Sequence, residues 1–232
     1  MRLSGEEMNH KLYLVSTPIG NPEDITLRAL KILRDADIVV CEELKPARRL
    51  LAGYNLQKEL IPLNEHNERE SAKEVLKLIQ NGKNVALISD GGTPLFSDPG
   101  HYLVELCIQN NIQIVPVVGA NSLIPALTGS GLDIEKFYYY GWLSPNKELR
   151  RKELIKLKNL KELIVILDTP YRLIKLLSDV EMIFGKRQLV VVAYKLTMGE
   201  EKFFRGEISS VLSQIEQNEL KGEFVLLIEN RI

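Results

Sequence analysis

Hydrophobic positions along the 232-residue chain alternate between short runs rich in β-branched residues and segments with helical spacing. In the first half, apolar runs predict strands at 12–17, 37–43, 60–64, 84–90 and 113–119. These runs are continuous rather than alternating, and helical segments separate them. That combination indicates a parallel sheet with helices on both faces.

The segments between these runs carry helix signals. Residues 24–37 place Ile25, Ala29, Ile32, Leu33 and Ala36 on one face of a helix. Pro46 suits the first turn of a second helix that stops near Gly53. For a third helix, Asn67 with Glu70 predicts a capping box, and the helix should end before Gly82.

The second half of the chain has a different pattern. Strands are expected at 137–143, 163–169, 188–196, 202–208 and 222–229, and only one helix, SSVLSQIEQ, lies between the last three. Short connections of this kind favour antiparallel pairs. We therefore predict two α/β domains, 1–120 with a largely parallel sheet and 121–232 with a mixed sheet, and a cleft at their junction.

Composition excludes several classes of protein. Hydrophobic residues make up 45% and charged residues 26% of the chain, which is ordinary for a soluble globular protein. The net charge of −1 offers no global field for nucleic acid, so any RNA contact must be local. Cys41 and Cys107 lack CxxC spacing, and His10, His66 and His101 are scattered, so we expect no disulfide framework and no metal site. The polar first residues and the absence of a membrane-length apolar run predict a cytoplasmic protein with no membrane association.

Three loops follow predicted strands of the first half. STPIGN (16–21) comes directly after the first strand, at the carboxyl edge where α/β sheets bind ligands. It is not GxGxxG, so a Rossmann fingerprint is not supported, and taken alone it favours a structural turn over a ligand turn. VVGANS (117–122) places Gly119 after a strand and Asn121 or Ser122 at a helix start, where free N–H groups attract anions.

The loop SDGGTPLFSDPG (89–100) is the most informative of the three. Gly91 and Gly92 allow the backbone to approach a ligand closely or to take positive φ. Asp90 can accept hydrogen bonds from a ligand amine or hydroxyl, and Asp98 before Pro99 can brace the loop as an Asx-turn. Ten residues exceed what a simple strand-to-helix connection needs, so a ligand loop is favoured over a structural turn.

Together these loops carry a family resemblance. LYLVSTPIGN, DITLRAL, SDGGTPLFSDPG, VVGANSLIPALTGSGL and KGEFVLLIE occur in the order typical of tetrapyrrole methylases. From about Lys11 to Glu229 the chain resembles this family, and most closely its ribosomal-RNA branch. The resemblance implies an S-adenosylmethionine-dependent methyltransferase (product S-adenosylhomocysteine), a cofactor cleft between the domains and a homodimer. It further implies 2′-O-methylation of a ribose in small-subunit ribosomal RNA.

The resemblance also implies site residues. Cofactor contacts are expected at Pro18, Ile19, Gly20, Asp90, Gly92, Thr93, Pro94, Asn121 and Ser122, with Leu167 and Leu196 on the adenine side. Core packing accounts equally well for Leu167. A ribose hydroxyl is weakly acidic, so a carboxylate or lysine near the methyl group would help. Glu42, Glu43, Lys45 and Lys195 are the catalytic candidates, although a surface salt bridge is the simpler explanation for each of them.

Departures from the family pattern keep other functions open. Where the RNA branch reads A-E-D-T-R, this chain has Cys41-Glu42-Glu43-Leu44-Lys45, and R-E-L-T-K has become residues 194–198, YKLTM. A methyltransferase for a tetrapyrrole-like small molecule or a protein side chain, and a non-catalytic cofactor-binding paralogue, are the alternatives. The basic run 147–161 with seven cations is either a solvated helix face or a phosphate-binding strip, and one face of the tyrosines at 138–140 could stack on a base.

Overall fold

A computed structural model describes residues 11–96 and 98–231 of the chain. His10, the polar N-terminal residues and Ser97 of the glycine-rich loop lie outside the described residues. The chain divides into two compact units, Met1–Asn121 and Ser122–Ile232. In the described part, no helix combines the length and apolar character needed to span a membrane.

The N-terminal unit alternates strands and helices along the chain. Its elements are β1 (Lys11–Val15), the 3₁₀ helix η1 (Pro22–Asp24), α1 (Leu27–Asp35), β2 (Ile38–Cys41), α2 (Leu44–Gly53), β3 (Glu59–Pro62), α3 (Glu68–Gln80), β4 (Val85–Ile88), α4 (His101–Gln109) and β5 (Gln113–Val117). The strand order is β3-β2-β4-β1-β5, and every pair in it is parallel. This confirms the predicted parallel sheet.

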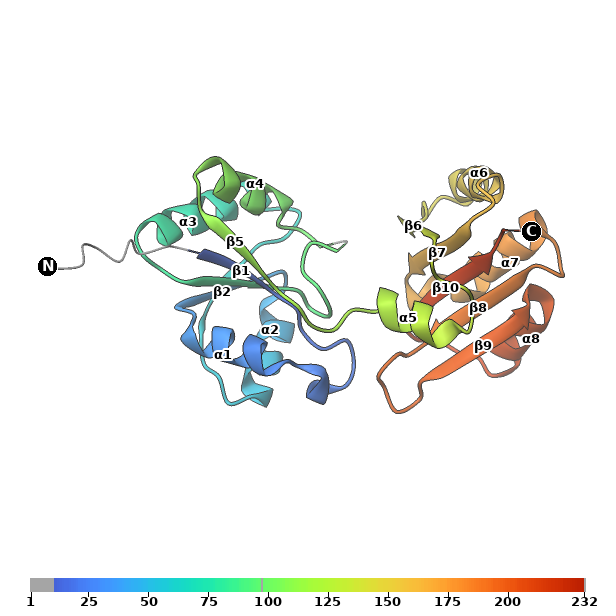
Figure 1. Cartoon of the computed structure of the whole chain (residues 1–232), viewed down its shortest axis with the longest axis horizontal. Helices are drawn as coiled ribbons and strands as arrows, with labels where there is room; N and C mark the ends of the chain where they lie inside the picture. Colours follow the sequence, from blue (N-terminus) through green and yellow to red (C-terminus); the bar gives the residue numbers. More distant parts are fainter. Residues whose placement is uncertain (1–10, 97, 232) are drawn as a thin grey trace, which may run out of the picture. The chain divides into compact units, whose positions relative to one another are not determined.

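Helices cover both faces of this sheet, α3 and α4 on one face and α1 and α2 on the other (Figure 1). Alternation along β1 shows the division. Leu12 packs with α3 and α4, whereas Tyr13 and Val15 lie on the α1–α2 face. Because β4, β1 and β5 are neighbours, the loops that follow them leave the sheet at the same edge.

Two helix starts differ from the sequence prediction. Residues 22–24 form η1, and α1 begins only at Leu27, where the Thr26 hydroxyl accepts a hydrogen bond from the Ala29 amide at 3.0 Å. The predicted capping box of α3 is wrong. Asn67 is the N-cap residue, but its side chain bonds backwards to the Asn64 amide and the Pro62 carbonyl, because its backbone is not extended (φ −120°, ψ 5°).

The C-terminal unit has a mixed sheet. Its elements are α5 (Leu123–Ser130), β6 (Phe137–Trp142), α6 (Lys147–Lys158), β7 (Leu163–Asp168), the 3₁₀ helix η2 (Pro170–Arg172), α7 (Leu173–Phe184), β8 (Leu189–Tyr194), β9 (Lys202–Glu207), α8 (Ile208–Gln217) and β10 (Phe224–Glu229). The strand order is β6-β7-β10-β8-β9; only β6–β7 is parallel and the other pairs are antiparallel. The predicted mixed sheet is therefore confirmed.

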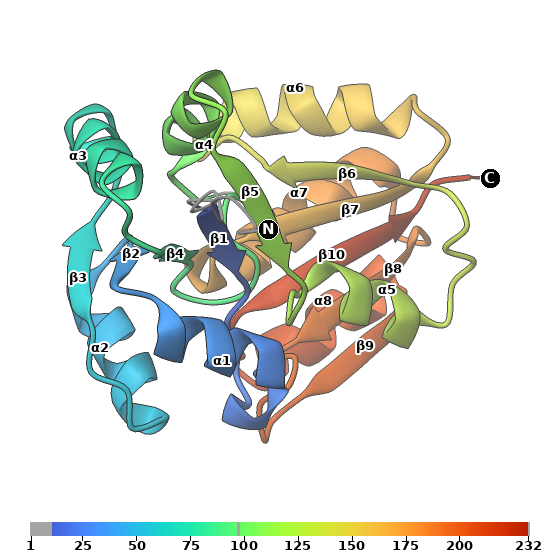
Figure 2. The ribbon, with the colours of Figure 1, turned by 60° about the vertical axis from the view of Figure 1, so that its left-hand side comes forward.

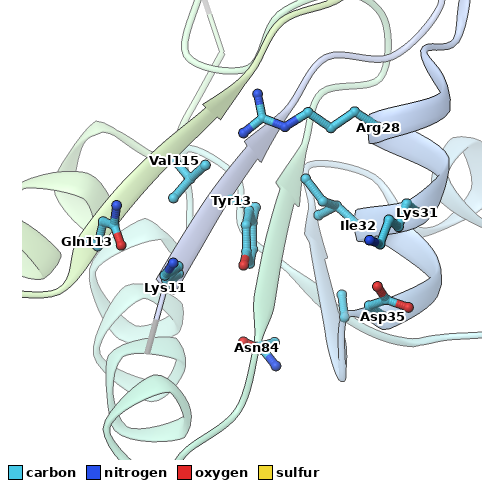
Figure 3. Close-up of a pocket in the computed structure, with 10 residues that line it drawn as sticks. Lys11, Tyr13, Arg28, Lys31, Ile32, Asp35, Asn84, Gln113 and Val115 are labelled. Atoms are coloured by element: carbon cyan, nitrogen blue, oxygen red, sulfur yellow. The ribbon is translucent and has the colours of Figure 1, made fainter. Parts of the chain in front are cut away.

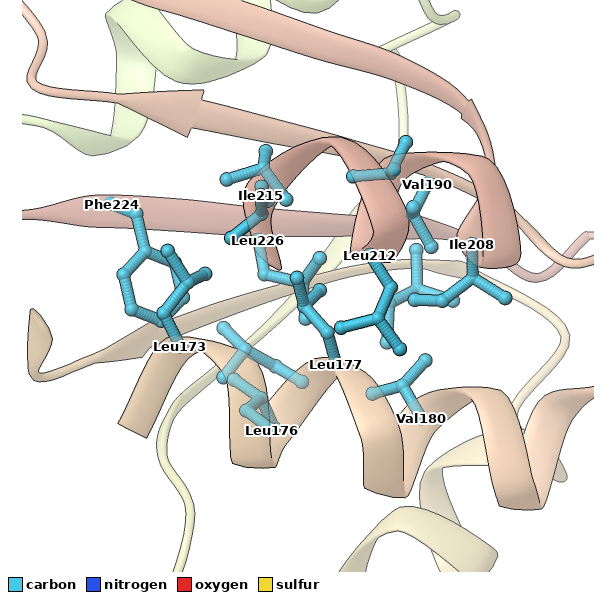
Figure 4. Close-up of a cluster of buried hydrophobic side chains, with 14 of the residues drawn as sticks. Leu173, Leu176, Leu177, Val180, Val190, Ile208, Leu212, Ile215, Phe224 and Leu226 are labelled. Atoms are coloured by element: carbon cyan, nitrogen blue, oxygen red, sulfur yellow. The ribbon is translucent and has the colours of Figure 1, made fainter. Parts of the chain in front are cut away.

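The core of this unit lies under α6, α7 and α8. Leu173, Leu176 and Leu177 of α7 pack against Leu226 of β10 and against α8 (Figure 4). On β9, Phe204 belongs to this core, while its neighbour Phe203 points to the other face and contacts Gly129 of α5. The helix α5 therefore covers the sheet face opposite α7 and α8 (Figure 2).

A buried ion pair fixes α6 onto α7. The Arg150 guanidinium meets the Asp179 carboxylate at 2.7 Å, with only 6% and 4% of the two side chains exposed, and Arg151 binds the other oxygen at 2.7 Å. At the end of α6, Lys158 donates to the Ile183 carbonyl at 2.7 Å. Arg150 is therefore buried and not available to a phosphate, whereas the choice between a solvated helix face and a phosphate-binding strip for the other cations of the basic run stays open.

We expect Asp179→Asn to lower the free energy of unfolding by about 3–5 kcal/mol, because Arg150 would stay buried without a counter-charge. Urea unfolding of the full chain measures this loss. Lys83→Ala is the matched control, since its ion pair with Asp37 is exposed and should contribute less than about 1 kcal/mol. Equal losses for the two variants would contradict a structural role for the buried pair.

Candidate active site

The loops after β1 and β4 are joined by paired backbone hydrogen bonds. The Thr17 amide donates to the Gly92 carbonyl at 2.8 Å, and the Gly92 amide donates back to the Thr17 carbonyl at 2.9 Å. The Thr17 hydroxyl donates to the Ser89 carbonyl at 3.1 Å, and both threonine and serine are buried. Three bonds therefore fix TPIGN (17–21) against the start of the 89–100 loop.

Hydroxyl groups extend this junction to the loop after β5. The Thr93 hydroxyl donates to the Ala120 carbonyl at 3.3 Å and lies 3.1 Å from the Ser16 hydroxyl. Because Thr93 uses its one proton on Ala120, Ser16 is the donor to Thr93. The three loops that the sequence singled out thus form one hydrogen-bonded assembly, which we call the loop junction (residues 16–21, 89–94 and 117–121).

Close approach in the loop junction requires glycine at two positions. Gly92 has φ +93°, and a Cβ there would lie 3.3 Å from Cγ2 of Ile19. At Gly119 a Cβ would lie only 2.8 Å from Cβ of Ser16. Close packing within the loop junction therefore requires glycine at both positions, in addition to the approach of a ligand that the sequence suggests.

Next to the loop junction lies a group of carboxylates, which we call the acidic edge (Glu42, Glu43, Asp90 and Asp98). Glu42 follows β2 and Asp90 follows the neighbouring β4, so the parallel sheet brings them to the same edge. Burial, followed by the charges of Asp98 and Asp90, raises the pKa of Glu42. Asp90 is exposed as a residue, yet the partial burial of its carboxyl group raises its pKa, although a backbone hydrogen bond with Glu43 opposes the shift.

Asp98 completes the acidic edge from inside the 89–100 loop. Burial raises its pKa, while a hydrogen bond with the Ser89 side chain lowers it. Cys41, at the end of β2, has its pKa raised to about 11 by burial and by Asp90 and Glu43, so its thiol stays neutral and is not a nucleophile. Carboxylates that repel one another favour a cationic ligand or a proton, and both reduce the repulsion.

Other candidate residues lie around these features. Pro18, Ile19 and Gly20 run from half-buried to exposed along the first loop, and Lys45 is exposed on the first turn of α2. Ser122 is the N-cap of α5, but its helical backbone (φ −86°, ψ −25°) makes no side-chain cap bond. Within residues 11–96 and 98–231, no group of three or more His, Cys, Asp or Glu side chains is arranged to hold a metal ion.

In the C-terminal unit, the segment after β8 is held in an unusual backbone conformation. Lys195 and Thr197 have positive φ (47° and 65°), which is rare for residues other than glycine, above all for the β-branched Thr197. Leu196 between them and Leu167 at the end of β7 are 7% and 9% exposed. Both therefore fit core packing, with little of either side chain open to a ligand.

Lys195 is paired with an acid. Its ammonium group lies 2.5 Å from the Glu200 carboxylate, and its amide donates to the Glu223 carbonyl at 2.8 Å. The hydrogen bond with Glu200 raises the pKa of Lys195 above its ordinary value. Lys195 is therefore a cation that acts as a hydrogen-bond donor, and it is a poor proton acceptor at neutral pH.

Sequence reasoning missed Ser16 and Thr17 as the residues that hold the loops together. Ser16 is 3% and Thr17 1% exposed. The available signal was two polar residues directly after an apolar strand, which are buried only if they have partners. Their partners lie more than 70 residues away in sequence, so the signal alone did not identify them.

The sequence that forms this arrangement matches a known protein family. The family model described as Tetrapyrrole (Corrin/Porphyrin) Methylases matches residues 11–212. The chain belongs to this family. The predicted membership is therefore confirmed, and with it the assignment of the chain as a methyltransferase.

Relatives within the family match nearly the whole chain. "Ribosomal RNA small subunit methyltransferase I" of Bacillus subtilis is 37% identical and covers 99% of this chain and 78% of the relative. The protein of the same name from Thermotoga maritima is 39% identical (95% of this chain, 99% of the relative), and that from Rickettsia prowazekii is 41% identical (95% and 79%).

Solved structures of the family share the fold. A cobalt precorrin-4 methyltransferase superimposes with a TM-score of 0.68 at 19% identity, covering 98% of both chains. A uroporphyrin III C-methyltransferase from Thermus thermophilus gives 0.65 at 18% identity, covering 94% of this chain and 96% of the other. These neighbours confirm the predicted α/β fold of the methylase family.

We expect Gly119→Ala to lower the free energy of unfolding by about 1–3 kcal/mol, because the new methyl group would force β5 and the residue after β1 apart. Urea unfolding followed by far-UV circular dichroism measures the change. Gly53→Ala, at the end of α2, is the control, since a Cβ there meets nothing within 4 Å. A Gly119 variant as stable as the Gly53 variant would show that the loop junction tolerates the methyl group.

Proposed function

We propose that this protein transfers a methyl group from S-adenosylmethionine to a ribose 2′-hydroxyl of small-subunit ribosomal RNA. The RNA substrate rests on one observation, the shared name of relatives that are 37–41% identical over at least 95% of this chain, and the ribose 2′-hydroxyl rests on the resemblance of the sequence to the ribosomal-RNA branch. Action as a cytoplasmic homodimer belongs to the same proposal. The near-neutral net charge does not conflict with an RNA substrate, because local cations are sufficient for binding.

The residues present suit the cofactor. S-adenosylmethionine carries a sulfonium and an ammonium group, and the acidic edge favours cations. Asp90 is exposed at the end of β4, where its carboxylate is open to a ligand. The loop junction adds Pro18, Ile19, Gly20, Gly92, Thr93, Pro94 and Asn121 as neighbours for the cofactor, with Ser122, Leu167 and Leu196 as contacts from the C-terminal unit.

Glu42 is the group in this chain best suited to accept the hydroxyl proton. When bound, S-adenosylmethionine supplies an electrophilic methyl group. Glu42 is half-buried and its pKa is raised by burial and by neighbouring acids, so its carboxylate is more basic than an ordinary glutamate. Glu43 and Lys45 are exposed and remain weaker candidates. Lys195 is paired with Glu200 and held protonated, so it is also a weaker candidate for accepting the proton.

Calorimetry tests cofactor binding. Asp90→Ala should weaken S-adenosylmethionine binding by about tenfold, because a hydrogen bond to a charged group is lost. In the wild type, affinity should fall as the pH drops through the raised pKa values of Asp90 and Glu42, since a protonated carboxyl no longer attracts a cation. S-adenosylhomocysteine, which lacks the sulfonium charge, should show the smaller pH dependence.

The unfolding transition of the Asp90 variant is the control for this measurement. The pKa of Asp90 is higher in the folded chain than in the unfolded chain. At neutral pH the ionised carboxylate therefore lowers the free energy of unfolding, and Asp90→Ala should be at least as stable as the wild type. An unfolded variant would make Asp90 a structural brace. Failure of the wild type to bind S-adenosylmethionine would reject the proposed function altogether.

A tritiated-methyl assay on undermethylated small ribosomal subunits tests the acceptor. The wild type should label the ribosomal RNA, and Glu42→Gln should lower kcat about a hundredfold when S-adenosylmethionine is saturating. Glu74→Gln, an exposed glutamate on α3, is the control and should retain full activity. If the label appears in a free tetrapyrrole or in ribosomal protein instead of RNA, that molecule is the methyl acceptor and the proposed RNA acceptor is wrong.

A further inference from the structure

One face of the N-terminal sheet carries an open trough that the loop junction and the acidic edge do not include. Its cavity volume is about 620 Å³ and its lining includes Lys11, Tyr13, Arg28, Lys31, Asp35 and Val115 (Figure 3). We call it the β1–α1 trough. All of these residues belong to the N-terminal unit, so the trough is complete within that unit.

The trough exists because the helices on this face do not bury the first residues of β1 and β5. In the core on this face, α1 and α2 pack on β2 and β4 and on Val15 and Val117, the last residues of β1 and β5. The beginning of β1 and of β5 at the edge lies beyond them. There Lys11 pairs with Gln113 and Tyr13 with Val115, so alternation places all four side chains on one face.

The other wall of the trough is one side of α1. Arg28, Lys31, Ile32 and Asp35 follow helical spacing along this side, and Figure 3 shows Arg28 extending over β1 and Ile32 pointing toward the strands. Arg28 and Lys31 are exposed, and Lys11 is half-buried. No ion pair among the described residues joins these three cations to Asp35.

We propose that the β1–α1 trough binds a single-stranded segment of RNA, with a base stacked on Tyr13 and phosphates contacted by Lys11, Arg28 and Lys31. An aromatic ring on the floor of a groove lined by cations is the arrangement that binds unpaired nucleic acid. Three cations against one acid make the trough positive on a chain whose net charge is −1. The positive charge is thus local, as RNA binding by this chain requires.

Charge also argues against a second copy of this chain in the trough. In a two-fold interface centred here, Arg28 and Lys31 would face the same cations of the partner, with only Asp35 to compensate. A free cofactor is a poor fit as well. Tyr13 is three residues before Ser16, the first residue of the loop junction, so at about 3.3 Å per residue it lies ~10 Å from that residue.

This inference rests on the proposed function, because RNA is its ligand. The trough would hold a part of the RNA remote from the methylated ribose. It would therefore contribute to substrate binding and leave the chemical step unchanged. Loss of the trough should raise KM for the ribosomal subunit, while kcat and cofactor affinity stay as in the wild type.

Fluorescence anisotropy with a labelled single-stranded oligoribonucleotide tests the proposal directly. The variant K11A/R28A/K31A should bind at least tenfold more weakly, and the slope of log K against log salt should fall by about 2, since three phosphate contacts are lost. Tyr13→Leu, which keeps an apolar side chain against α1, should weaken binding about tenfold, and Tyr13→Phe should restore it. K73A/K77A removes two exposed lysines of α3 on the opposite face and should bind as the wild type.

The outcomes separate this proposal from the proposed function. Unchanged RNA binding in both the triple variant and Tyr13→Leu would overturn the trough site, even if the wild type methylates ribosomal RNA. Trough-dependent RNA binding by a wild type that transfers no methyl group to the small subunit would support the trough and reject the function. A triple variant with an altered sedimentation coefficient and normal RNA binding would mean that a second copy occupies the trough, and would also overturn the proposal.

Discussion

The two backbone hydrogen bonds between Thr17 and Gly92 are the contact on which the candidate site depends. They form an isolated antiparallel bridge between segments that leave the sheet in the same direction, so one segment must turn back on itself. Gly92 makes that turn possible at φ +93°, a conformation that costs energy for any residue with a Cβ. Thr93 then reaches Ala120, and the loop after β5 joins the other two. The position of every predicted cofactor contact in the N-terminal unit follows from this junction.

The acidic edge shows how the fold sets chemistry as well as position. A parallel sheet ends all of its strands at one edge, so acids that follow β2 and β4 become neighbours although 48 residues separate Glu42 from Asp90. Burial and mutual repulsion raise their pKa values, and among the described residues no ion pair offsets the negative charge of Glu42 or Asp90. Lys195 is the opposite case, since Glu200 stabilises its charge. Among the catalytic candidates, the carboxylates are therefore better suited to accept a proton than Lys195.

Sequence was sufficient for the features that depend on local pattern. The strands of both units, the parallel and mixed sheets and the predicted ends of α2 and α3 agree with the structure, because apolar periodicity and glycine or proline punctuation act over a few residues. The predictions failed where the conformation of a side chain depends on a partner that its local sequence pattern does not indicate. Asn67 turns back to Pro62 instead of capping α3, and Arg150 and Arg151 bind Asp179, which no local pattern connects to the basic run. The catalytic roles of Glu42, Glu43, Lys45 and Lys195 stay predictions.

The β1–α1 trough could not be predicted for a different reason. Lys11, Tyr13, Arg28 and Lys31 are near one another in sequence, and each is unremarkable there. They form one surface for two reasons. The edge strand β5 lies beside β1, and α1 lies over β2 and β4, so the beginning of β1 is left uncovered. Strand order is a property of the whole unit, so it cannot be read from any short segment. The strand β1 consequently serves two purposes, since its first residues face the trough and its last residue leads into Ser16 and Thr17 of the loop junction. A rigid strand of five residues thus fixes the distance between the proposed RNA contact and the cofactor loops.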